Sequence, residues 1–537
     1  MEVKTIEPQR PNNQVEQDIL SLLNVISDAQ KGYATSTDFV NALEREGILM
    51  DDPRIQKLMA DLNATRLLNV AERSIQPEEF EEYVRQNAIV KNAFTKNLVI
   101  PDFADFQKDF EEMFHETAKN TDGHVATYIP QLARVNPDQF AVSVCTIDGQ
   151  RFSFGDSNTN FGLQSTCKPI NYCLALREHG EATVHKHVGR EPSGRSFNEL
   201  SLNRQGLPHN PLINSGAIMT SSLLKPDLPM ADRFDYVFKT WQRLCAGKTM
   251  EFNNAVYLSE RETADRNFAL AYFMRENKAF PENTKLHDTL ELYFQCCSIE
   301  SSTHNLAIAA STLANAGVNP LSGEQIFDEK TVQNCMSLML SCGMYDFSGE
   351  FAFKIGLPAK SGVSGALMIV IPNVMGISIW SPRLDKHGNT VRGVEFCERL
   401  VEKYNFHNFD SLTRETNKKN PRNKKYETHI NQIVTLIYAA SCGDLEEIKR
   451  LEATGADLSM ADYDGRTALH LAAAENQVEV VKYLLSRKVN AQPVDRWKGT
   501  PLDDAKQGGH DAVIKLLEKN MGIKPEDKSD AATKPKK

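Results

Sequence analysis

A repeat near the C-terminus restricts the possible fold more than any other feature of this sequence. Apolar residues of the same type or size recur there at an interval of 33 residues. Four sets of positions share this interval: Leu436, Leu469 and Leu502; Ala439, Ala472 and Ala505; Ile448, Val481 and Ile514; Leu451, Leu484 and Leu517. A period of this length predicts stacked supersecondary units that bury a continuous core between neighbours.

The repeat resembles the ankyrin family, in which each unit is a turn followed by two helices. The resemblance rests on the period and on the runs TALHLA at 467–472 and TPL at 500–502. We therefore assign residues 428–520 to ankyrin repeats, which implies a possible protein partner. Residues 411–427 before them are basic and predict a solvated linker, and residues 521–537 after them predict a disordered tail.

Composition narrows the class of protein. The formal charge of −10 argues against nucleic acid as a main partner. The ten cysteines form no C-x-x-C pair and no zinc-ligand spacing, which indicates reduced intracellular thiols and no metal site. The longest apolar run, at 366–380, is interrupted by Pro372 and is too short for a membrane span. Residues 1–13 are expected to be disordered, and they carry acidic residues unlike a transit peptide, so a cytoplasmic location stays open.

Residues 14–99 predict a helical domain with an EF-hand-like arrangement. Helix starts are indicated at residues 37 and 76, where a capping residue or a proline precedes acidic and then apolar positions. We expect no calcium there. The loop from Ser27 has Ala29 and Lys31 at ligand positions, and the loop that ends at Glu79 has Arg73 where a glycine is required.

Residues 100–410 carry the features expected of an enzyme. Two alternating runs, 140–147 and 150–154, flank an Asp-Gly pair and predict a β-hairpin. A helix-rich stretch follows over residues 165–345. Residues 360–371 and 374–380 then predict two further strands that turn at Pro372-Asn373.

The strongest chemical signal is a serine and a lysine three residues apart. Pro169 is tolerated only in the first turn of a helix, so Ser165 is expected at the helix N-terminus with Lys168 one turn along the same face. A buried lysine can be neutral and take the serine proton, while helix N–H groups suit a developing oxyanion.

A second motif, Lys360-Ser361-Gly362, stands at the start of a predicted strand. The order of hairpin, S-x-x-K helix, helical insertion, K-S-G strand and final hairpin resembles the serine β-lactamases and penicillin-binding proteins. The resemblance implies an α+β catalytic domain with an antiparallel sheet and a helical domain. No S-D-N motif is evident between the two motifs, so this match is incomplete.

The chain is more closely similar to the serine-dependent glutaminases of the animal kidney/liver type. The resemblance rests on eight runs: YIPQL at 128–132, VSVCT at 142–146, QSTCKP at 164–169, HNPLINSGAI at 209–218, SERE at 259–262, DRNFA at 265–269, CGMYDF at 342–347 and LPAKSGV at 357–363. It implies hydrolysis of L-glutamine to L-glutamate and ammonia through a γ-glutamyl-serine, without a cofactor. It also implies activation by inorganic phosphate, assembly into homodimers, tetramers or filaments, and a mitochondrial location.

The resemblance further implies the roles of single residues. Ser165 would be the nucleophile, Lys168 the proton acceptor and Tyr345 a catalytic proton shuttle. The backbone N–H groups of Ser165 and Val363 would form the oxyanion hole. Glu260 would hold the substrate α-amine, and the other substrate contacts would be Tyr128, Asn214, Asn267 and Tyr293. Cys167 is expected to be a buried, inert thiol, and residues 194–201 correspond to the family's flexible loop at a subunit interface.

Two alternatives from other classes remain at this point. One is a penicillin-recognising serine hydrolase, although such an enzyme would need an export signal. The other is a catalytically silent scaffold that binds partners through its ankyrin and helical modules.

Overall fold

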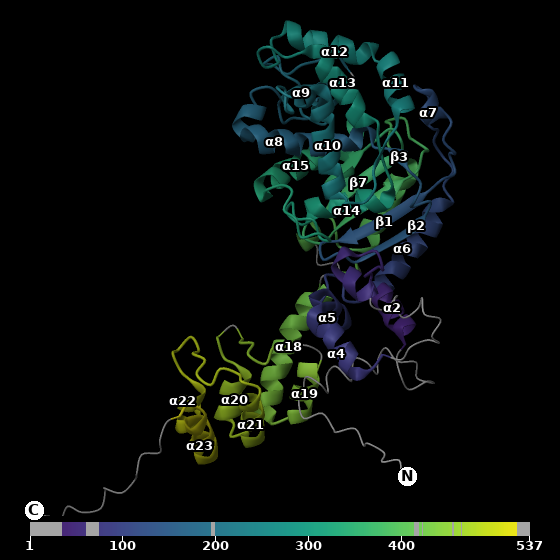
Figure 1. Ribbon diagram of the computed structural model, residues 1–537. Coiled ribbons are helices and arrows are strands. Elements are labelled where there is room, and N and C mark those ends of the chain that lie inside the picture. The colour runs from purple at the N-terminus through teal and green to yellow at the C-terminus, as the bar shows by residue number, and fades with distance from the viewer. Residues whose placement is uncertain are drawn as a thin grey trace, which may run out of the picture. The chain divides into compact units, whose positions relative to one another are not determined.

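The computed structural model describes residues 35–60, 75–194, 199–412, 418–421, 423–453, 456–462 and 464–522 (Figure 1). The chain divides into two compact units. The larger unit consists of residues 40–69 and 96–422, and the smaller one of residues 1–39, 70–95 and 423–537. The region expected to be catalytic therefore lies within one unit.

A five-stranded antiparallel sheet forms the centre of the larger unit, with the strand order β2-β1-β8-β7-β6. Its strands are β1 (Ala141–Thr146), β2 (Arg151–Gly155), β6 (Ala359–Ser361), β7 (Ala366–Ile371) and β8 (Met375–Trp380). Every residue of β1, β7 and β8 is buried, so these strands are covered on both faces.

The predicted hairpins are present, with one correction. β1 and β2 pair around Gly149, which has a φ of +87° that a glycine adopts without strain. β7 and β8 pair around Asn373, as expected. However, residues 360–371 form two strands rather than the single strand predicted. The chain turns between β6 and β7 at Gly365, whose φ is +90°, and this turn folds β6 back onto β7.

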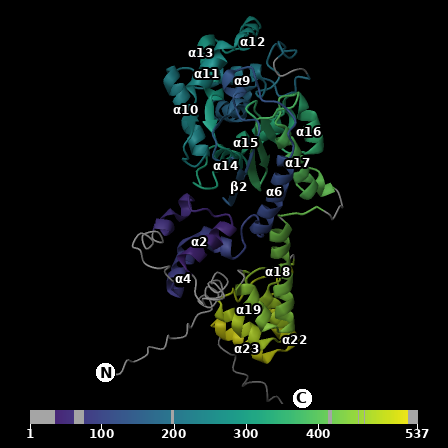
Figure 2. The ribbon, with the colours of Figure 1, turned by 90° about the vertical axis from the view of Figure 1, so that its right-hand side faces the viewer.

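Helices cover the two faces of the sheet. The covering helices are α14 (Thr303–Ala314) on one face, and α6 (Phe103–Ala118) and α17 (Val391–Lys403) on the other. Successive residues of β1 face opposite sides: Ser143 donates to Thr303 of α14 at 2.8 Å, whereas Val142 packs in the cluster with α6 and α17. Figure 2 shows α6 and α17 beside one another.

A helical layer follows the sheet, as predicted, and packs around a second apolar core. Its helices are α8 (Lys168–Val184), α9 (Asn214–Leu223), α10 (Met230–Leu244), α11 (Asn254–Glu262), α12 (Asp265–Glu276), α13 (Leu286–Cys297) and α15 (Glu329–Cys342). A small three-stranded sheet accompanies it, in the order β3 (Phe161–Gly162), β5 (Ile299–Ser301) and β4 (Glu251–Phe252).

Short elements complete the larger unit. They are α7 (Pro130–Ala133), α16 (Ser348–Lys354) and the 3₁₀ turns η1 (Pro53–Ile55), η2 (Gln164–Cys167), η3 (Tyr345–Phe347) and η4 (Asp410–Leu412). Lys418 and Lys419, which belong to the predicted basic linker, pair with Asp410 at 2.9 Å and Asp109 at 2.5 Å. These two lysines are therefore held against the larger unit by ion pairs.

The helices expected near the N-terminus begin close to the predicted residues. α2 spans Ser36–Arg45, and α4 spans Pro77–Gln86 with a capping box between Gln76 and Glu79, followed by α5 (Ala88–Phe94). Phe39, Phe80 and Phe94 form an aromatic cluster with ring centroids 5.5–5.8 Å apart. The candidate calcium loop from Ser27 and position Arg73 lie outside the described residues.

The C-terminal repeat forms three helix pairs with one continuous core. The pairs are α18 (Asn423–Cys442) with α19 (Leu445–Ala453), α20 (Ala468–Ala474) with α21 (Val478–Ser486), and α22 (Pro501–Gly508) with α23 (Asp511–Asn520). Leu436, Leu469, Leu451, Leu484 and Leu517 are all buried in it, as the 33-residue interval predicts. α18 begins at residue 423, inside the segment predicted as linker.

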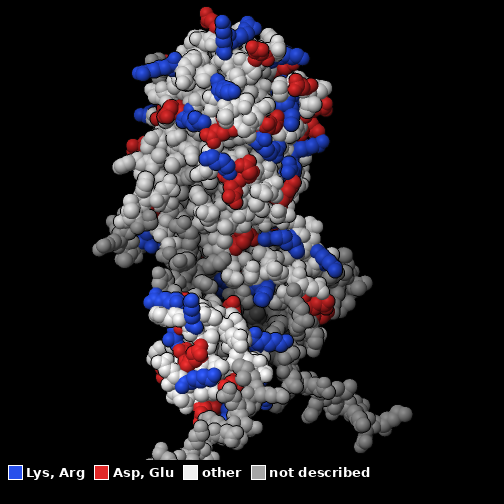
Figure 3. All heavy atoms as spheres, turned by 90° about the vertical axis from the view of Figure 1, so that its left-hand side faces the viewer, with Lys and Arg blue, Asp and Glu red and all other residues white. Residues whose placement is uncertain are grey.

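On the face in Figure 3, basic and acidic side chains are interspersed rather than gathered by sign. None of the helices in the described ranges is long and apolar enough to cross a membrane.

Candidate active site

The serine of the S-x-x-K motif lies where the chain enters α8. Ser165 is in the turn η2, Lys168 is the first residue of α8, and Pro169 occupies the first helical turn, as the sequence predicts. Ser165 is 9% exposed and Lys168 is 1% exposed. The residue before the serine, Gln164, has a φ of +49°, a strained value typical of residues held in place at functional sites.

The environment of Lys168 suits a neutral amine. Its Nζ donates to Asn214 Oδ1 at 2.6 Å. Burial lowers the pKa of Lys168 to about 8, although neighbouring groups, including the Glu260 carboxylate, act in the opposite direction. About one tenth of this amine is therefore unprotonated at pH 7 and can accept a proton from a hydroxyl group.

The K-S-G strand reaches the nucleophile turn. A side chain at Gly362 would place its Cβ 3.0 Å from the carbonyl oxygen of Leu163 and 3.2 Å from Thr166, so the strand approaches this turn closely. Lys360 is fully buried, and its Nζ donates to the carbonyls of Gly343 at 3.1 Å and Ser361 at 2.7 Å. Burial, together with the charge of Lys168, lowers the pKa of Lys360 well below its usual value.

Tyr345 lies between these two motifs. It has a φ of +54°, and its ring centroid is 4.5 Å from Lys360 Nζ. Burial raises the pKa of the Tyr345 phenol, and a hydrogen bond with the Ser165 side chain opposes that rise. Ser348 fixes the turn, because its hydroxyl donates to the Tyr345 carbonyl at 2.7 Å. The phenol therefore lies next to the candidate nucleophile.

An acidic group on α11 belongs to the same site. Tyr128 donates its hydroxyl hydrogen to Glu260 Oε1 at 2.5 Å, and Gln164 Nε2 donates to the same oxygen at 3.0 Å. Glu260 is 8% exposed, and burial raises its pKa in spite of these hydrogen bonds and of the Lys168 charge. The arrangement presents a buried carboxylate that a cationic group of a ligand would stabilise.

Two of the predicted substrate contacts, Asn214 on α9 and Tyr293 on α13, are linked to the lysine through hydrogen bonds. Tyr293 donates to Asn214 Oδ1 at 3.3 Å, which is the oxygen that also accepts from Lys168. Asn267 lies on α12, which packs against α9, and its buried Oδ1 has no hydrogen-bond partner among the described residues. Val363 packs beside Ile129.

The structure thus brings Ser165, Lys168, Asn214, Tyr293, Tyr345, Glu260 and Tyr128 into one linked group. Sequence reasoning missed three members of it: Gln164, Lys360 and Cys297, whose thiol hydrogen-bonds to Cys167. The first two stand inside motifs that were recognised. Cys297 carries no local signal. All ten cysteines are free thiols, and Cys167 is fully buried.

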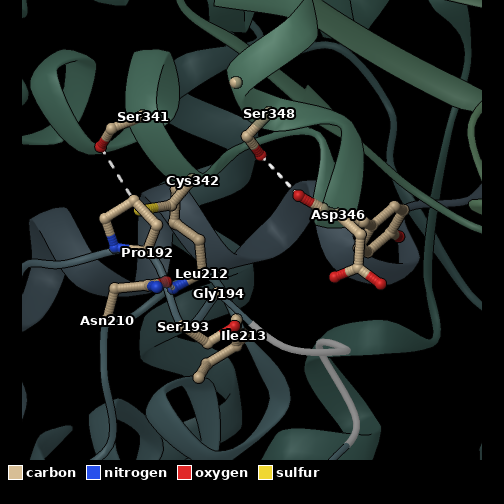
Figure 4. Close-up of a pocket in the computed structure, with 12 residues that line it drawn as sticks. Pro192, Ser193, Gly194, Asn210, Leu212, Ile213, Ser341, Cys342, Asp346 and Ser348 are labelled. Carbon is tan, nitrogen blue, oxygen red and sulfur yellow. Dashed lines mark hydrogen bonds between the residues drawn. The ribbon is translucent and has the colours of Figure 1, made fainter. Parts of the chain in front are cut away.

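A cavity opens beside Tyr345. Its volume is about 490 Å³, and its walls come from residues 192–194, 210–213 and 341–349 (Figure 4). Residues 195–198 of the expected flexible loop lie outside the described part of the chain. The cavity therefore gives a small molecule space beside Tyr345.

No set of three or more His, Cys, Asp or Glu side chains within the described ranges could hold a metal ion.

The fold and the site define the class of protein. A serine at a helix start, a buried lysine one turn later and a K-S-G strand on an antiparallel sheet are the features of a β-lactamase-like fold.

Comparison with known proteins narrows this class to a family. Residues 123–409 match the glutaminase family, residues 436–529 match ankyrin repeats in three copies, and residues 17–101 match an EF-hand domain. The chain belongs to the glutaminase family, and its activity is the hydrolysis of glutamine.

Similar proteins support this membership over most of the chain. "Putative glutaminase 3" of Caenorhabditis elegans is 49% identical over 510 residues, covering 94% of this chain and 87% of that protein. "Glutaminase liver isoform, mitochondrial" of Mus musculus is 45% identical over 482 residues, covering 89% and 80%. A solved structure titled "Probable glutaminase ybaS" matches with a TM-score of 0.54 and 33% identity, covering 56% of this chain and 97% of that one.

Proposed function

We propose that this glutaminase cleaves glutamine through a γ-glutamyl ester of Ser165. The observation that carries the proposal is the buried Lys168 amine, whose pKa of about 8 leaves it able to act as a base one helical turn from the serine. The sequence alone left a penicillin-recognising hydrolase and a silent scaffold open, and the family match favours neither.

The reaction proceeds in two halves. Ser165 Oγ attacks the side-chain amide carbon of glutamine while its proton passes to Lys168, and the backbone N–H groups of Ser165 and Val363 stabilise the oxyanion. The C–N bond then breaks, and the leaving nitrogen takes a proton through Tyr345 to depart as ammonia. In the second half Lys168 takes a proton from the water that attacks the ester; the ester C–O bond then breaks, glutamate is released, and that proton passes to Ser165 Oγ.

Substrate recognition follows from the charges of the site. The Glu260 carboxylate pairs with the α-ammonium group of glutamine, which offsets the unfavourable burial of both charges. Tyr128 and Gln164 hold this carboxylate in position. Asn214, Asn267 and Tyr293 supply the polar contacts to the rest of the amino acid.

Further properties rest on resemblance to relatives. We infer activation by inorganic phosphate, assembly into a homotetramer or filament, and a mitochondrial location. The last inference is supported by the rodent liver isoforms, whose names include the word mitochondrial. We also infer a protein partner for the ankyrin repeats.

The nucleophile is tested by ammonia release from glutamine. Ser165→Ala should reduce turnover by about three orders of magnitude or more. Cys167→Ala is the matched control, because this thiol is adjacent and fully buried, and it should retain activity. Full turnover by Ser165→Ala, or a comparable loss in Cys167→Ala, would contradict the assignment.

A further inference from the structure

A second cavity, with a volume of about 300 Å³, borders the linked group of the candidate active site at Gln164. None of the residues assigned above to direct glutamine contact lines it, but Gln164 does. Its walls come from α7 and the residues that follow it, from β3 and β5, and from the start of α11. Its volume lies at the lower end of the range for small-molecule sites.

The absence of a side chain on β3 keeps this space open. Gly162 pairs with Glu300 across the small sheet, and a Cβ on this glycine would meet no atom closer than 3.8 Å. Nearby, Phe161 and Trp380 stack with ring centroids 5.2 Å apart and contribute an apolar part of the lining. A cavity with an aromatic wall and a few polar groups is typical of sites for small molecules.

Two polar atoms of the lining are unsatisfied. Ser364 is 5% exposed, and its hydroxyl has no hydrogen-bond partner among the described residues. The buried Oε1 of Gln131 likewise has none in that part of the chain. A buried polar group without a partner is unfavourable, so a ligand that hydrogen-bonds to these two atoms would be stabilised in the cavity.

The charges of the lining indicate the kind of ligand. Arg134 is exposed and forms no ion pair with any of the described residues. Glu300 accepts from Asn253 at 2.8 Å and is partly exposed. One cation and one anion, in a lining that also carries carboxamide side chains, match a ligand that has one charge of each sign.

We propose that this cavity is a second binding site for a small zwitterionic amino acid, distinct from the catalytic site. The ammonium group of the ligand lies toward Glu300 and Gln131 Oε1, its carboxylate toward Arg134, and Ser364 hydrogen-bonds to it. Gln164 separates this ligand from Glu260, because its side chain both lines the cavity and donates to that carboxylate.

Tryptophan provides a local readout of occupancy. The chain has three tryptophans, and only Trp380 lines the cavity. We would label the full chain, carrying Ser165→Ala to prevent turnover, with 5-fluorotryptophan and assign the three fluorine signals by single Trp→Phe variants. L-glutamate, L-glutamine and glycine are the probes, and glutarate, which lacks the amine, is the negative control.

The proposal predicts a saturable shift of the Trp380 signal with at least one of the three amino acids and none with glutarate. Arg134→Gln and Ser364→Ala should each raise the dissociation constant at least about tenfold. Arg204→Gln, on an exposed turn away from the lining, is the matched control and should leave it unchanged. No shift with any of the three amino acids, or the same dissociation constant in all variants, would overturn the proposal.

Discussion

At the scale of single residues, the site depends on how burial changes the charge of a few groups. Lys168 and Glu260 are both buried, and burial moves both pKa values toward the neutral form. The lysine is thereby prepared to accept a proton, and the carboxylate is prepared to receive a cation. Each of these consequences can be measured separately.

The first consequence concerns how catalysis depends on pH. Because the base must be unprotonated, kcat/KM should rise about tenfold per pH unit below the pKa of Lys168, about 8, and level off above it. Lys168→Arg keeps the charge but cannot be deprotonated, so it should abolish turnover. Lys186→Arg, an exposed lysine of the same unit, is the control. A kcat/KM that does not change with pH around this pKa would contradict the role of Lys168.

The second consequence concerns recognition of the α-ammonium group of glutamine. Glu260→Gln removes the negative charge but keeps the size of the side chain, so KM for glutamine should rise about thirtyfold or more, equivalent to about 2 kcal/mol. Glu262→Gln, exposed on the same helix, should leave KM unchanged. Steady-state kinetics measure KM for each variant. An unaltered KM in Glu260→Gln would refute the assignment of Glu260 to the α-ammonium group.

Sequence spacing predicted only part of this site. Ser165 and Lys168 are three residues apart, so helix geometry alone places them together. The contacts of Glu260 with Tyr128 and Gln164 join residues 132 and 96 positions apart. No local pattern encodes such distant pairs, and only the family resemblance indicated that Tyr128 and Glu260 belong to one site.

At the scale of elements, the close approach of α14 to β8 has a clear steric origin. A Cβ at Gly376 would lie 2.2 Å from the backbone nitrogen of Ser311 and 2.5 Å from the carbonyl carbon of Ala310. Backbone atoms cannot move aside as a flexible side chain can. The helix therefore covers the sheet at this distance only because β8 has a glycine there.

Gly376→Ala should accordingly lower the free energy of unfolding by about 1–3 kcal/mol or more. Gly349→Ala is the matched control, since its Cβ would meet no atom within 4 Å and alanine favours the helix α16. Thermal unfolding should show a lower midpoint only for Gly376→Ala. Equal midpoints for the two variants would show that α14 does not need to approach β8 this closely.

The elements themselves were largely predictable from local signals. The Asp-Gly turn, the capping residue Gln76 and Pro169 each encode a boundary through backbone geometry. The division of residues 360–371 into β6 and β7 was missed, because an apolar run does not show where the chain turns. Gly365, with its positive φ, was the available signal.

At the scale of the whole molecule, the repeat has its own apolar core, formed by residues of α18 to α23. The 33-residue interval predicted the buried positions of that core. It could not predict that α18 begins at residue 423, because the basic residues there are compatible with either a helix or a linker.

Leu484→Ala should therefore destabilise the repeat by about 2–5 kcal/mol, since this fully buried side chain lies in the core. Leu412→Ala is the control, because that leucine is 79% exposed. Calorimetry should show a lower transition for the repeat and an unchanged transition for the catalytic unit. A shift of both transitions would mean that the two cores unfold together.

The central claim is that a γ-glutamyl-enzyme forms on Ser165. It is tested most directly by measuring how this intermediate partitions between water and hydroxylamine. Glutamine and the γ-methyl ester of glutamate would each be hydrolysed by the full chain in the presence of hydroxylamine. The account predicts the same ratio of glutamate to γ-glutamyl hydroxamate from both substrates, because both pass through one ester, and no hydroxamate with Ser165→Ala. A ratio that depends on the leaving group would contradict it.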